Sequence, residues 1–417
     1  MKTVCVGMSG GVDSSVSALL LKEQDYRVVG IYMKNWSRDL PGMKCPWAED
    51  LADAKRVAVK LGIDFEVWDF EEEYRQKVVE YMLAEFKKGN TPNPDVMCNQ
   101  EIKFKLFYER AMERGADFIA TGHYARAVSL ARAFATTGAN ARPLGRELPK
   151  ANEASPITMG ASKEASESDI VLARAKDENK DQTYFLYRIS NEALARTIFP
   201  IGDMMKPEVK KLAKEKGLHN AYKKESMGVC FVGEVGMRDF LKEYIDVRPG
   251  EIREIESKKV LGYHEGAVFY TIGQRHGLYL SGEKGSTNDG LPYYVVDKDL
   301  KNNIVYVSKN LNDQHIWTKE LKLKDLVIRT NQLGLQTLAT TGANVRSLKC
   351  ELPKVNETSE EVGRVSLLVR LRHRAPLIPA TFDGKVLRFE HEIKRPASGQ
   401  SAVFYDDKIC LGGGIIS

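Results

Sequence analysis

The chain has 417 residues, more than a single hydrophobic core usually organises, so its length predicts two or three domains. It carries a net charge of +5 at pH 7, and the segment 206–224 alone holds seven lysines against two glutamates. Such a run is typical of a solvated helix face, and by itself it only permits a polyanionic partner. No apolar stretch is long enough to span a bilayer and no signal-peptide pattern precedes the first strand, which predicts a cytoplasmic protein with no membrane partner.

The six cysteines stand singly, at positions 5, 45, 98, 230, 350 and 410, without a CxxC pair. This spacing favours neither a zinc cage nor a disulfide framework, and no haem is implied. A cysteine that takes part in chemistry is therefore expected to act as a reactive thiol.

The first predicted element is an apolar strand at Val4–Val6, followed by a loop of glycine and serine and by a helix that begins near Val12. Gly10 and Gly11 have no side chain that would keep a phosphate away from the backbone, and the helix start presents free N–H groups. Hydroxyl groups that add phosphate donors stand at Ser9, Ser14 and Ser15. This arrangement predicts a phosphate site, with an ordinary glycine-rich turn as the alternative.

No lysine precedes the serine of this loop, as one does in a Walker loop. The pattern SGGVDS at 9–14 instead resembles the nucleotide loop of the PP-loop ATP pyrophosphatases, which split ATP between its α and β phosphates. Asp13 is suited to hold a Mg²⁺ ion on the pyrophosphate. ATP and Mg²⁺ are therefore the expected cofactors.

The following apolar runs alternate between strand and helix. Strands are predicted at 28–33, 64–68 and 118–121, and helices at 48–61, 71–88 and 105–114. This alternation predicts a parallel sheet with helices on both faces. Ligands of such sheets lie beyond the carboxyl ends of the strands, where the Gly7 loop, Met33 and Gly122 all fall. Met33 is either part of the core or an apolar lid on an adenine.

A loop with two prolines, Pro92 and Pro94, precedes Cys98. Cys98 is expected near a helix start, where the pKa of a thiol falls and its thiolate becomes available. Asp95 lies three residues earlier, close enough to accept or donate a proton at the same reacting atom. Taken alone, a cysteine such as Cys98 is more often a buried structural thiol.

The second cysteine of interest, Cys230, is flanked by Gly228 and Gly233. This placement suits a thiol on a mobile loop, and the alternative is a short buried strand with an incidental cysteine. An ATP-activating loop together with two thiols in separate loops predicts sulfur chemistry. One thiol would carry a persulfide, and the other would attack or resolve it.

From about residue 262 the pattern changes to short alternating runs separated by turn signals, among them 267–271, 293–297, 304–307 and 401–405. This spacing predicts an antiparallel barrel or sandwich. The expected α/β organisation is a parallel-sheet PP-loop domain (adenine nucleotide alpha-hydrolase-like) at 1–199, a small helical central domain at 200–262 that carries Cys230, and a C-terminal antiparallel β-barrel at 263–417.

Two insertions are expected, near 129–168 and near 333–362. The segment 135–153 reappears in similar form as 339–357, and two copies are too few for a solenoid. The composition of the first is that of a flexible surface loop outside the active chemistry. A docking element for a shared partner is the alternative, and the likeness of the two segments has no physical account.

The motifs together resemble one family, the tRNA-specific 2-thiouridylases, within the PP-loop ATP pyrophosphatase superfamily. The resemblance covers nearly the whole chain apart from the two insertions. It is carried by SGGVDSS at 9–15, PNPDVMCN at 92–99, ATGHYAR at 120–126, KDQTYFL at 180–186, GVCFVGE at 228–234, YTIGQR at 270–275 and GQSAVFY at 399–405.

The resemblance implies an enzyme, a tRNA-uridine 2-sulfurtransferase. ATP would adenylate the C2 oxygen of the wobble uridine in tRNA, with release of pyrophosphate. A persulfide on Cys230, loaded by a cysteine desulfurase or a sulfur-relay protein, would then deliver sulfur to C2 as AMP leaves. Cys98 would be the attacking or resolving thiol, with a transient disulfide to Cys230, and Asp95 would be the acid/base.

The resemblance also implies which residues contact each substrate. The expected ATP contacts are Gly7, Met8, Ser9, Gly10, Gly11, Val12, Asp13, Ser14, Met33 and Gly122. The expected tRNA contacts are Asn93, Pro94, Asp95, His123, Lys180, Asp181, Gln182, Arg372, His373 and Gln400. The family more often has a small hydroxyl residue where Met227 stands and a tyrosine where His373 stands.

Two other classes of protein are alternatives to a 2-thiouridylase. One is another PP-loop enzyme, either a 4-thiouridine or 2-thiocytidine synthase or an amidating ligase such as a GMP or argininosuccinate synthetase. An amidating ligase needs no pair of loop thiols, and a cluster-dependent thiolase would favour a CxxC pair, which this sequence lacks. The other class is a non-catalytic RNA-binding or assembly protein, which would not require Asp13, Asp95, Cys98 and Cys230 all to be intact.

Overall fold

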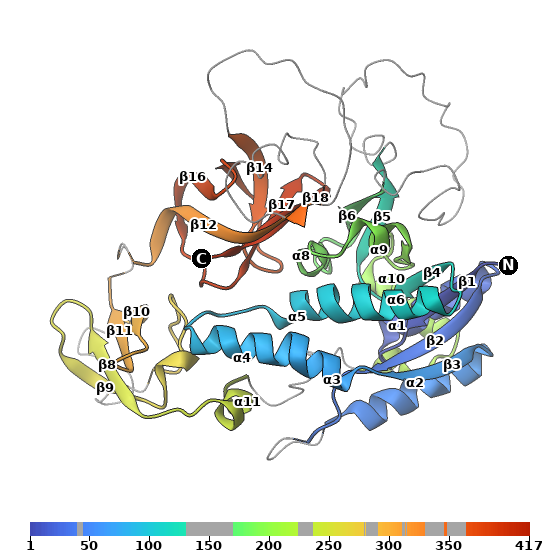
Figure 1. Cartoon of the computed structure of the whole chain (residues 1–417), viewed down its shortest axis with the longest axis horizontal. Helices are drawn as coiled ribbons and strands as arrows, with labels where there is room; N and C mark the ends of the chain where they lie inside the picture. Colours follow the sequence, from blue (N-terminus) through green and yellow to red (C-terminus); the bar gives the residue numbers. More distant parts are fainter. Residues whose placement is uncertain are drawn as a thin grey trace, which may run out of the picture.

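The structure is a computed structural model, and it describes residues 1–39, 45–130, 170–223, 237–278, 280, 291–310, 313, 315–329, 346–347 and 364–417. Within these residues the strands form three sheets, and the sheets correspond to three regions of the molecule in Figure 1. The nucleotide loop lies in the first region, and the C-terminal barrel forms the last.

The first sheet has five parallel strands in the order β3-β2-β1-β4-β7. They are β1 (Thr3–Gly7), β2 (Arg27–Lys34), β3 (Asp64–Asp69), β4 (Phe118–Thr121) and β7 (Thr197–Ile198). Gly7 at the end of β1 pairs with Ile31 of β2 and with Thr121 at the end of β4, so β1 and β4 end together beside the loop that follows Gly7, and β2 continues past it to Lys34. The predicted parallel sheet is confirmed.

Helices cover both faces of this sheet (Figure 1). α1 (Val12–Glu23), α2 (Trp47–Leu61) and α10 (Lys206–Glu215) pack on one face. Side chains of β1 alternate between the two cores, because Val4 and Val6 join the core of α1 whereas Cys5 joins the core on the other face. A strand buried on both faces explains the continuous apolar run near the amino terminus.

Two long helical stretches lie side by side on the second face (Figure 1). The first consists of α3 (Glu71–Tyr74), η1 (Arg75–Val79) and α4 (Glu80–Lys87); the second consists of α5 (Pro94–Met97), η2 (Cys98–Leu106) and α6 (Phe107–Glu113). Both η1 and η2 are π-helical, a form that occurs often at functional sites. The helix predicted at 71–88 is confirmed, whereas the helix expected from residue 105 begins earlier, at Pro94.

Six antiparallel strands close into the C-terminal barrel, as the sequence predicted. They are β12 (Trp317–Ile328), β14 (Val365–Arg370), β15 (Ile378–Phe382), β16 (Val386–Lys394), β17 (Ser401–Asp406) and β18 (Ile409–Ile416). The barrel is closed because β12 pairs with both β16 and β18. Its interior is apolar, with Leu323, Val369 and Phe404 among the buried side chains. A short strand, β13 (Arg346–Ser347), pairs with β12.

A hairpin of the nucleotide region extends the barrel sheet. Strands β5 (Ala125–Ser129) and β6 (Ile170–Arg174) pair with each other, and β6 also pairs with β18 at Ile409. Ser129 and Ile170 are partners in this hairpin, so the residues that flank the first predicted insertion lie opposite each other. Both predicted insertions fall almost entirely outside the described residues.

The third sheet has four strands in the order β10-β11-β8-β9. They are β8 (Gly250–Glu254), β9 (Val260–His264), β10 (Tyr294–Asp299) and β11 (Ile304–Ser308), and they follow α11 (Met237–Tyr244). The strand predicted at 267–271 is wrong, because Ala267–Phe269 form a single 3-10 turn, η5, with Ala267 buried against this sheet. The division of the chain at residues 199 and 262 stays a prediction.

Candidate active site

The nucleotide loop is shaped by close backbone packing at two glycines. Gly10 has φ +75°, and a Cβ there would lie 2.4 Å from the carbonyl oxygen of Asp50 on α2. A Cβ on Gly122 would lie 2.6 Å from the backbone nitrogen of Ser14. Both positions therefore require glycine, the first for conformation and space and the second for space alone. The turn after β4 thus presses directly on the start of α1.

The first turn of α1 offers amide groups to an anion. Its N-cap residue is Gly11, and no side chain caps the helix. The hydroxyls of Ser14 and Ser15 instead donate to the carbonyl of Gly11, at 3.1 and 2.9 Å, and the Ser9 amide donates to Ser14 Oγ at 3.2 Å. A helix start without a side-chain cap, behind a glycine loop, fits a phosphate group.

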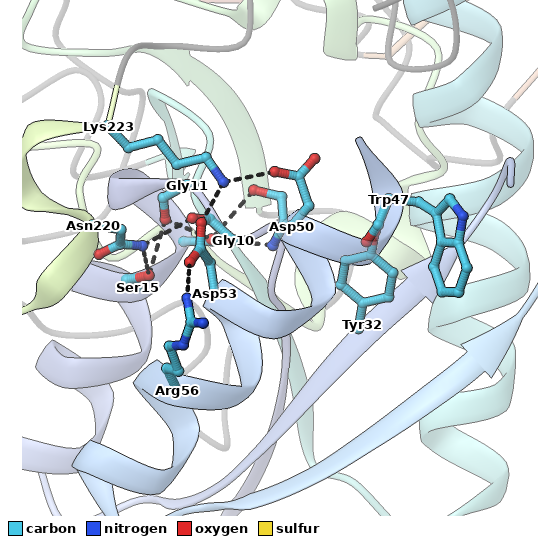
Figure 2. Close-up of polar contacts among 12 residues, drawn as sticks. Gly10, Gly11, Ser15, Tyr32, Trp47, Asp50, Asp53, Arg56, Asn220 and Lys223 are labelled. Atoms are coloured by element: carbon cyan, nitrogen blue, oxygen red, sulfur yellow. Dashed lines mark hydrogen bonds and ion pairs between the residues drawn. The ribbon is translucent and has the colours of Figure 1, made fainter. Parts of the chain in front are cut away.

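A clamp from a distant segment holds the loop from outside (Figure 2). Asn220, in η4 (His219–Tyr222), donates through Nδ2 to the Gly10 carbonyl and to Ser15 Oγ, both at 2.9 Å. Lys223 Nζ lies 2.7 Å from Asp50 Oδ1 and 2.6 Å from Asp53 Oδ2. Burial opposes the charge of Lys223, but these two hydrogen bonds outweigh it and raise the pKa of the lysine. No motif in the sequence indicated this clamp, since its parts lie about 170 to 210 positions apart.

Asp13 is held by a lysine that the sequence placed on a solvated face. Lys206 Nζ lies 2.7 and 2.8 Å from the two carboxylate oxygens of Asp13, and the Tyr124 hydroxyl donates to Oδ1 at 3.1 Å. Lys206 is only 6% exposed. The interpretation of the whole 206–224 run as a solvated face is therefore wrong for its first residue, because Lys206 begins α10 and points toward the loop.

Met33 and Met8 stand near the end of β1 on opposite faces of the sheet, Met33 against the core of the α5–α6 stretch and Met8 in the core of α1. The Met33 Cε lies 2.9 Å from where a Cβ on Gly7 would stand, so Met33 is half-buried over the end of β1. Met8 and Val12 are buried, at 1% and 4% exposure. The Met8 amide donates to the Ile31 carbonyl at 2.8 Å. Both readings of Met33, core residue and lid, agree with this position.

Cys98 lies one turn inside a helix that Asn93 caps. The Asn93 side chain accepts hydrogen bonds from the amides of Asp95 and Val96, at 3.1 and 3.3 Å, and this cap starts the helix at Pro94. Asp95 and Cys98 are three residues apart and so share one face of the stretch. Cys98 is 2% exposed. Burial raises the pKa of the Asp95 carboxyl, although Lys103 opposes the shift.

The helical stretch that carries Cys98 packs on the nucleotide end of the sheet. The Phe107 ring lies 3.8 Å from where a Cβ on Gly7 would stand, and the Phe104 ring centroid lies 5.8 Å from that of His123. His123 Nδ1 is 2.8 Å from Thr121 Oγ1 at the end of β4. Burial, with Lys103 nearby, lowers the pKa of His123 well below its usual value, so the ring is neutral at pH 7. One helix thus joins the predicted thiol to the nucleotide loop.

Two residues expected to contact tRNA also hold the structure together. Asp181 is 1% exposed, and its Oδ2 accepts from Arg370 at 2.7 Å, so it ties the 180–182 segment to the barrel. Gln182 Oε1 accepts from the Tyr124 amide at 2.9 Å.

Gln400 and its neighbours join the barrel to the thiol loop, residues 91–98, which ends at Cys98. Gln400 Nε2 donates to the Thr91 carbonyl at 2.6 Å, and the Thr91 amide donates to the Ser398 carbonyl at 2.7 Å. These bonds hold the segment that precedes Pro92 against the loop between β16 and β17.

The turn after β14 presents basic groups. Arg372 is exposed, and the His373 ring packs on Phe185 with ring centroids 4.7 Å apart. Burial, together with Arg374 and Arg370, lowers the pKa of His373 to about 4. The positive charge of Lys180 also lowers the pKa of His373, so Lys180 lies near this turn. The structure therefore brings three of the predicted tRNA contacts into one region.

Two sequence predictions cannot be placed. Cys230 and Met227 lie outside the described residues, and Lys223 is the last described residue before them. Within the described part of the chain, no group of three or more His, Cys, Asp or Glu side chains is arranged to hold a metal ion. Asp13 offers a single carboxylate, which suits a Mg²⁺ ion that arrives with the phosphates of a nucleotide.

The fold and the site define a class: a nucleotide-binding parallel α/β domain with a pyrophosphatase-type loop, joined to two β domains. Comparison with family models agrees. A tRNA methyl transferase HUP domain model matches residues 2–234, a tRNA methyl transferase PRC-barrel domain model matches residues 238–309, and an Aminomethyltransferase beta-barrel domain model matches residues 345–416.

Curated relatives match over the full chain. The tRNA-specific 2-thiouridylase MnmA 1 of Geobacillus kaustophilus is 41% identical over 100% of this chain and 95% of the relative. The MnmA proteins of Listeria monocytogenes and Photobacterium profundum are each 41% identical, over 99% and 100% of this chain and 94% and 96% of the relative. The chain belongs to the MnmA family of tRNA-specific 2-thiouridylases.

One solved structure, a predicted subunit of tRNA methyltransferase from Methanocaldococcus jannaschii, aligns with 52% of this chain and 76% of its own length. Its TM-score is 0.27 and its identity 17%, a likeness too weak to inform the fold. Among the described helices, none has the length and apolar character needed to cross a membrane.

Proposed function

We propose that this chain makes 2-thiouridine at the wobble position of tRNA by ATP-dependent sulfur transfer. The observation that carries the proposal is that one helical stretch bears Cys98 and also packs on Gly7 and His123 at the nucleotide end of the sheet. The family models are described by methyl transfer, whereas the full-length relatives are named 2-thiouridylases. A pyrophosphatase loop serves adenylation, which fits the 2-thiouridylase activity named for the relatives better than it fits methyl transfer.

The first step activates the base. The C2 oxygen of the uridine attacks the α phosphorus of ATP, the bond between the α and β phosphates breaks, and pyrophosphate leaves. The loop from Gly7 to Ser14 would bind the phosphates through the uncapped start of α1, and Met33 would cover the adenine. Asp13 would hold a Mg²⁺ ion on the pyrophosphate. C2 then carries AMP as a good leaving group.

The second step transfers sulfur. The terminal sulfur of a Cys230 persulfide attacks C2 and AMP leaves, which joins Cys230 to the base through two sulfur atoms. The Cys98 thiolate attacks the Cys230 sulfur, the S–S bond breaks, and both electrons of that bond stay with the sulfur on C2. Two thiols are oxidised to a Cys98–Cys230 disulfide while the transferred sulfur is reduced. An external thiol reductant resets the pair, and a cysteine desulfurase or sulfur-relay protein supplies the next persulfide.

Asp95 suits the acid role in these steps. Burial raises its pKa, so a larger fraction of the carboxyl keeps its proton as pH rises toward neutrality. It shares a helix face with Cys98, and both therefore face the same reacting atom. A base flipped from the anticodon loop would enter beside Asn93, Pro94 and Asp95.

The tRNA would contact all three parts of the fold. Arg372 and Lys180 would supply positive charge to the RNA backbone near the His373 ring. His123, Gln182 and Gln400 would be further contacts, and the last two lie on the segments that join the nucleotide domain, the barrel and the thiol loop. Asp181 contributes by fixing this region through Arg370. A cytoplasmic location would give access to tRNA.

The test is direct. The full chain is incubated with unmodified tRNA, ATP, Mg²⁺, a thiol reductant and a persulfide source, and the tRNA is then digested to nucleosides and analysed by mass. We expect 2-thiouridine with the wild type and none when Cys98 and Cys230 are both replaced by serine. Cys5→Ala is the control, because Cys5 is buried in β1. Absence of 2-thiouridine with the wild type, or its persistence in the double variant, would contradict the proposal.

A further inference from the structure

Lys206 differs from the other lysines of α10. Its side chain is 8% exposed, whereas the Lys211 side chain on the same helix is 77% exposed. Its backbone amide donates to Asp177 Oδ2 at 2.9 Å, which fixes the start of the helix. Burying an ammonium group is costly unless it is paired, so the position of Lys206 calls for a partner.

A carboxylate at the nucleotide loop, that of Asp13, is one partner of Lys206. Lys206 Nζ lies 2.7 and 2.8 Å from the oxygens of Asp13, and it lies 5.8 Å from the ring centroid of Tyr124. Tyr124 in turn donates its hydroxyl to Asp13 at 3.1 Å. Three groups from three separate segments thus meet at the first turn of α1.

The location of this ammonium group suits a phosphate ligand. Asp13 is the second residue of α1, and the amides of this turn have no side-chain cap. A phosphate bound by those amides would lie next to Lys206 Nζ. The loop lacks the lysine that a Walker loop carries in its own sequence, and Lys206 brings an ammonium group to the same kind of place from 193 positions away.

We infer that Lys206 is a pyrophosphate-binding residue of this enzyme, paired with Asp13 when no nucleotide is bound and with the β and γ phosphates when ATP is bound. The inference rests on the proposed function only in taking ATP as the substrate. Asp13 becomes available to Mg²⁺ when the ammonium group moves to the phosphates. Because pyrophosphate gains negative charge as the α–β bond breaks, an ammonium group beside it favours its departure.

The experiment separates a phosphate contact from the Asp13 contact. Binding of inorganic pyrophosphate to the full chain is measured by calorimetry without divalent cations, in an Asp13→Asn background that removes the ion pair. We expect Lys206→Met in this background to weaken pyrophosphate binding by roughly ten- to hundredfold. Lys210→Met, an exposed change on the same helix, should weaken it less than about twofold.

Equal pyrophosphate affinity in Asp13→Asn and in Asp13→Asn/Lys206→Met would overturn the inference. A structural role is tested with AMP, which lacks the β and γ phosphates: an equal loss of AMP affinity in the Lys206→Met variant would also overturn it. If the double variant unfolds, the single variant Lys206→Arg keeps the charge and should retain pyrophosphate affinity within about threefold, and a loss beyond tenfold would count against the inference. Failure of the wild type to bind ATP would instead contradict the proposed function.

Discussion

The nucleotide loop and the thiol loop are held in their conformations by different kinds of contact. The nucleotide loop depends on backbone packing, since Gly10 and Gly122 leave no room for a Cβ. The thiol loop depends on side chains, with Asn93 capping the helix and Gln400 holding Thr91. The first is open toward a phosphate, whereas Cys98 is 2% exposed. Under the proposed function, ATP would meet a prepared site, whereas sulfur transfer would require the Cys98 thiol to become accessible.

The largest effect is expected from adding a methyl group to the nucleotide loop. Gly10→Ala forces a Cβ to 2.4 Å from the Asp50 carbonyl at φ +75°, so the loop must move. We expect ATP affinity to fall about ten- to hundredfold, measured by calorimetry. Gly115→Ala is the matched control, because Gly115 has φ +79° with nothing within 4 Å of its Cβ. An unchanged ATP affinity in Gly10→Ala would show that the loop is not prepared by its backbone.

A smaller effect is expected at the thiol loop. Asn93→Ala removes the cap of the helix that carries Cys98, which should lower the free energy of unfolding by about 0.5–2 kcal/mol. We expect the rate of 2-thiouridine formation to fall several-fold while ATP affinity stays within about twofold. Ser190→Ala is the control, since Ser190 caps α9 (Asn191–Ala195) through a 3.1 Å bond to the Ala193 amide. A parallel loss of ATP affinity in Asn93→Ala would show that the two loops are not independent.

The pH dependence of stability tests the surroundings of the thiol loop. The pKa of His373 is about 4, below its ordinary 6.5, so the unfolded state binds a proton that the folded state refuses. Stability is therefore fully present above pH 6.5 and falls as pH drops toward 4. His373→Phe should keep the ring contact with Phe185. Between pH 6.5 and 4 the thermal midpoint of this variant should fall less than that of the wild type, and at pH 8 the variant should be no more stable than the wild type. His391→Gln, at an exposed histidine, should follow the wild type.

The smallest effect is expected from shortening the first insertion. Ser129 and Ile170 pair in the hairpin, so residues 130–169 can be replaced by a two-residue Asn-Gly turn without stretching the chain. We expect the thermal midpoint to change by only about 2 °C and the rate of 2-thiouridine formation by less than about twofold. A tenfold loss of tRNA affinity would instead identify the insertion as a docking element.

Local patterns in the sequence predicted the parallel sheet, the barrel and the positions of the nucleotide and thiol loops. These features depend on apolar periodicity and on glycine or proline within a few residues. The pairing of Asp13 with Lys206 could not be predicted, because it joins residues 193 positions apart and lysine near a helix start usually faces solvent. The clamp by Asn220 and Lys223 and the burial of Asp181 depend on tertiary contacts of the same kind. The strand expected at 267–271 is instead a 3-10 turn, and its apolar side chains pack against the four-stranded sheet β10-β11-β8-β9.

In the proposed mechanism, activation and sulfur transfer are separate steps served by separate loops. The most direct test is pyrophosphate release in a single turnover of Cys98→Ser with ATP, Mg²⁺, unmodified tRNA and a persulfide source. We expect this variant to release about one pyrophosphate per bound tRNA and to form no 2-thiouridine. A variant that folds and binds tRNA but releases no pyrophosphate would contradict it, because Cys98 would then be needed for activation itself.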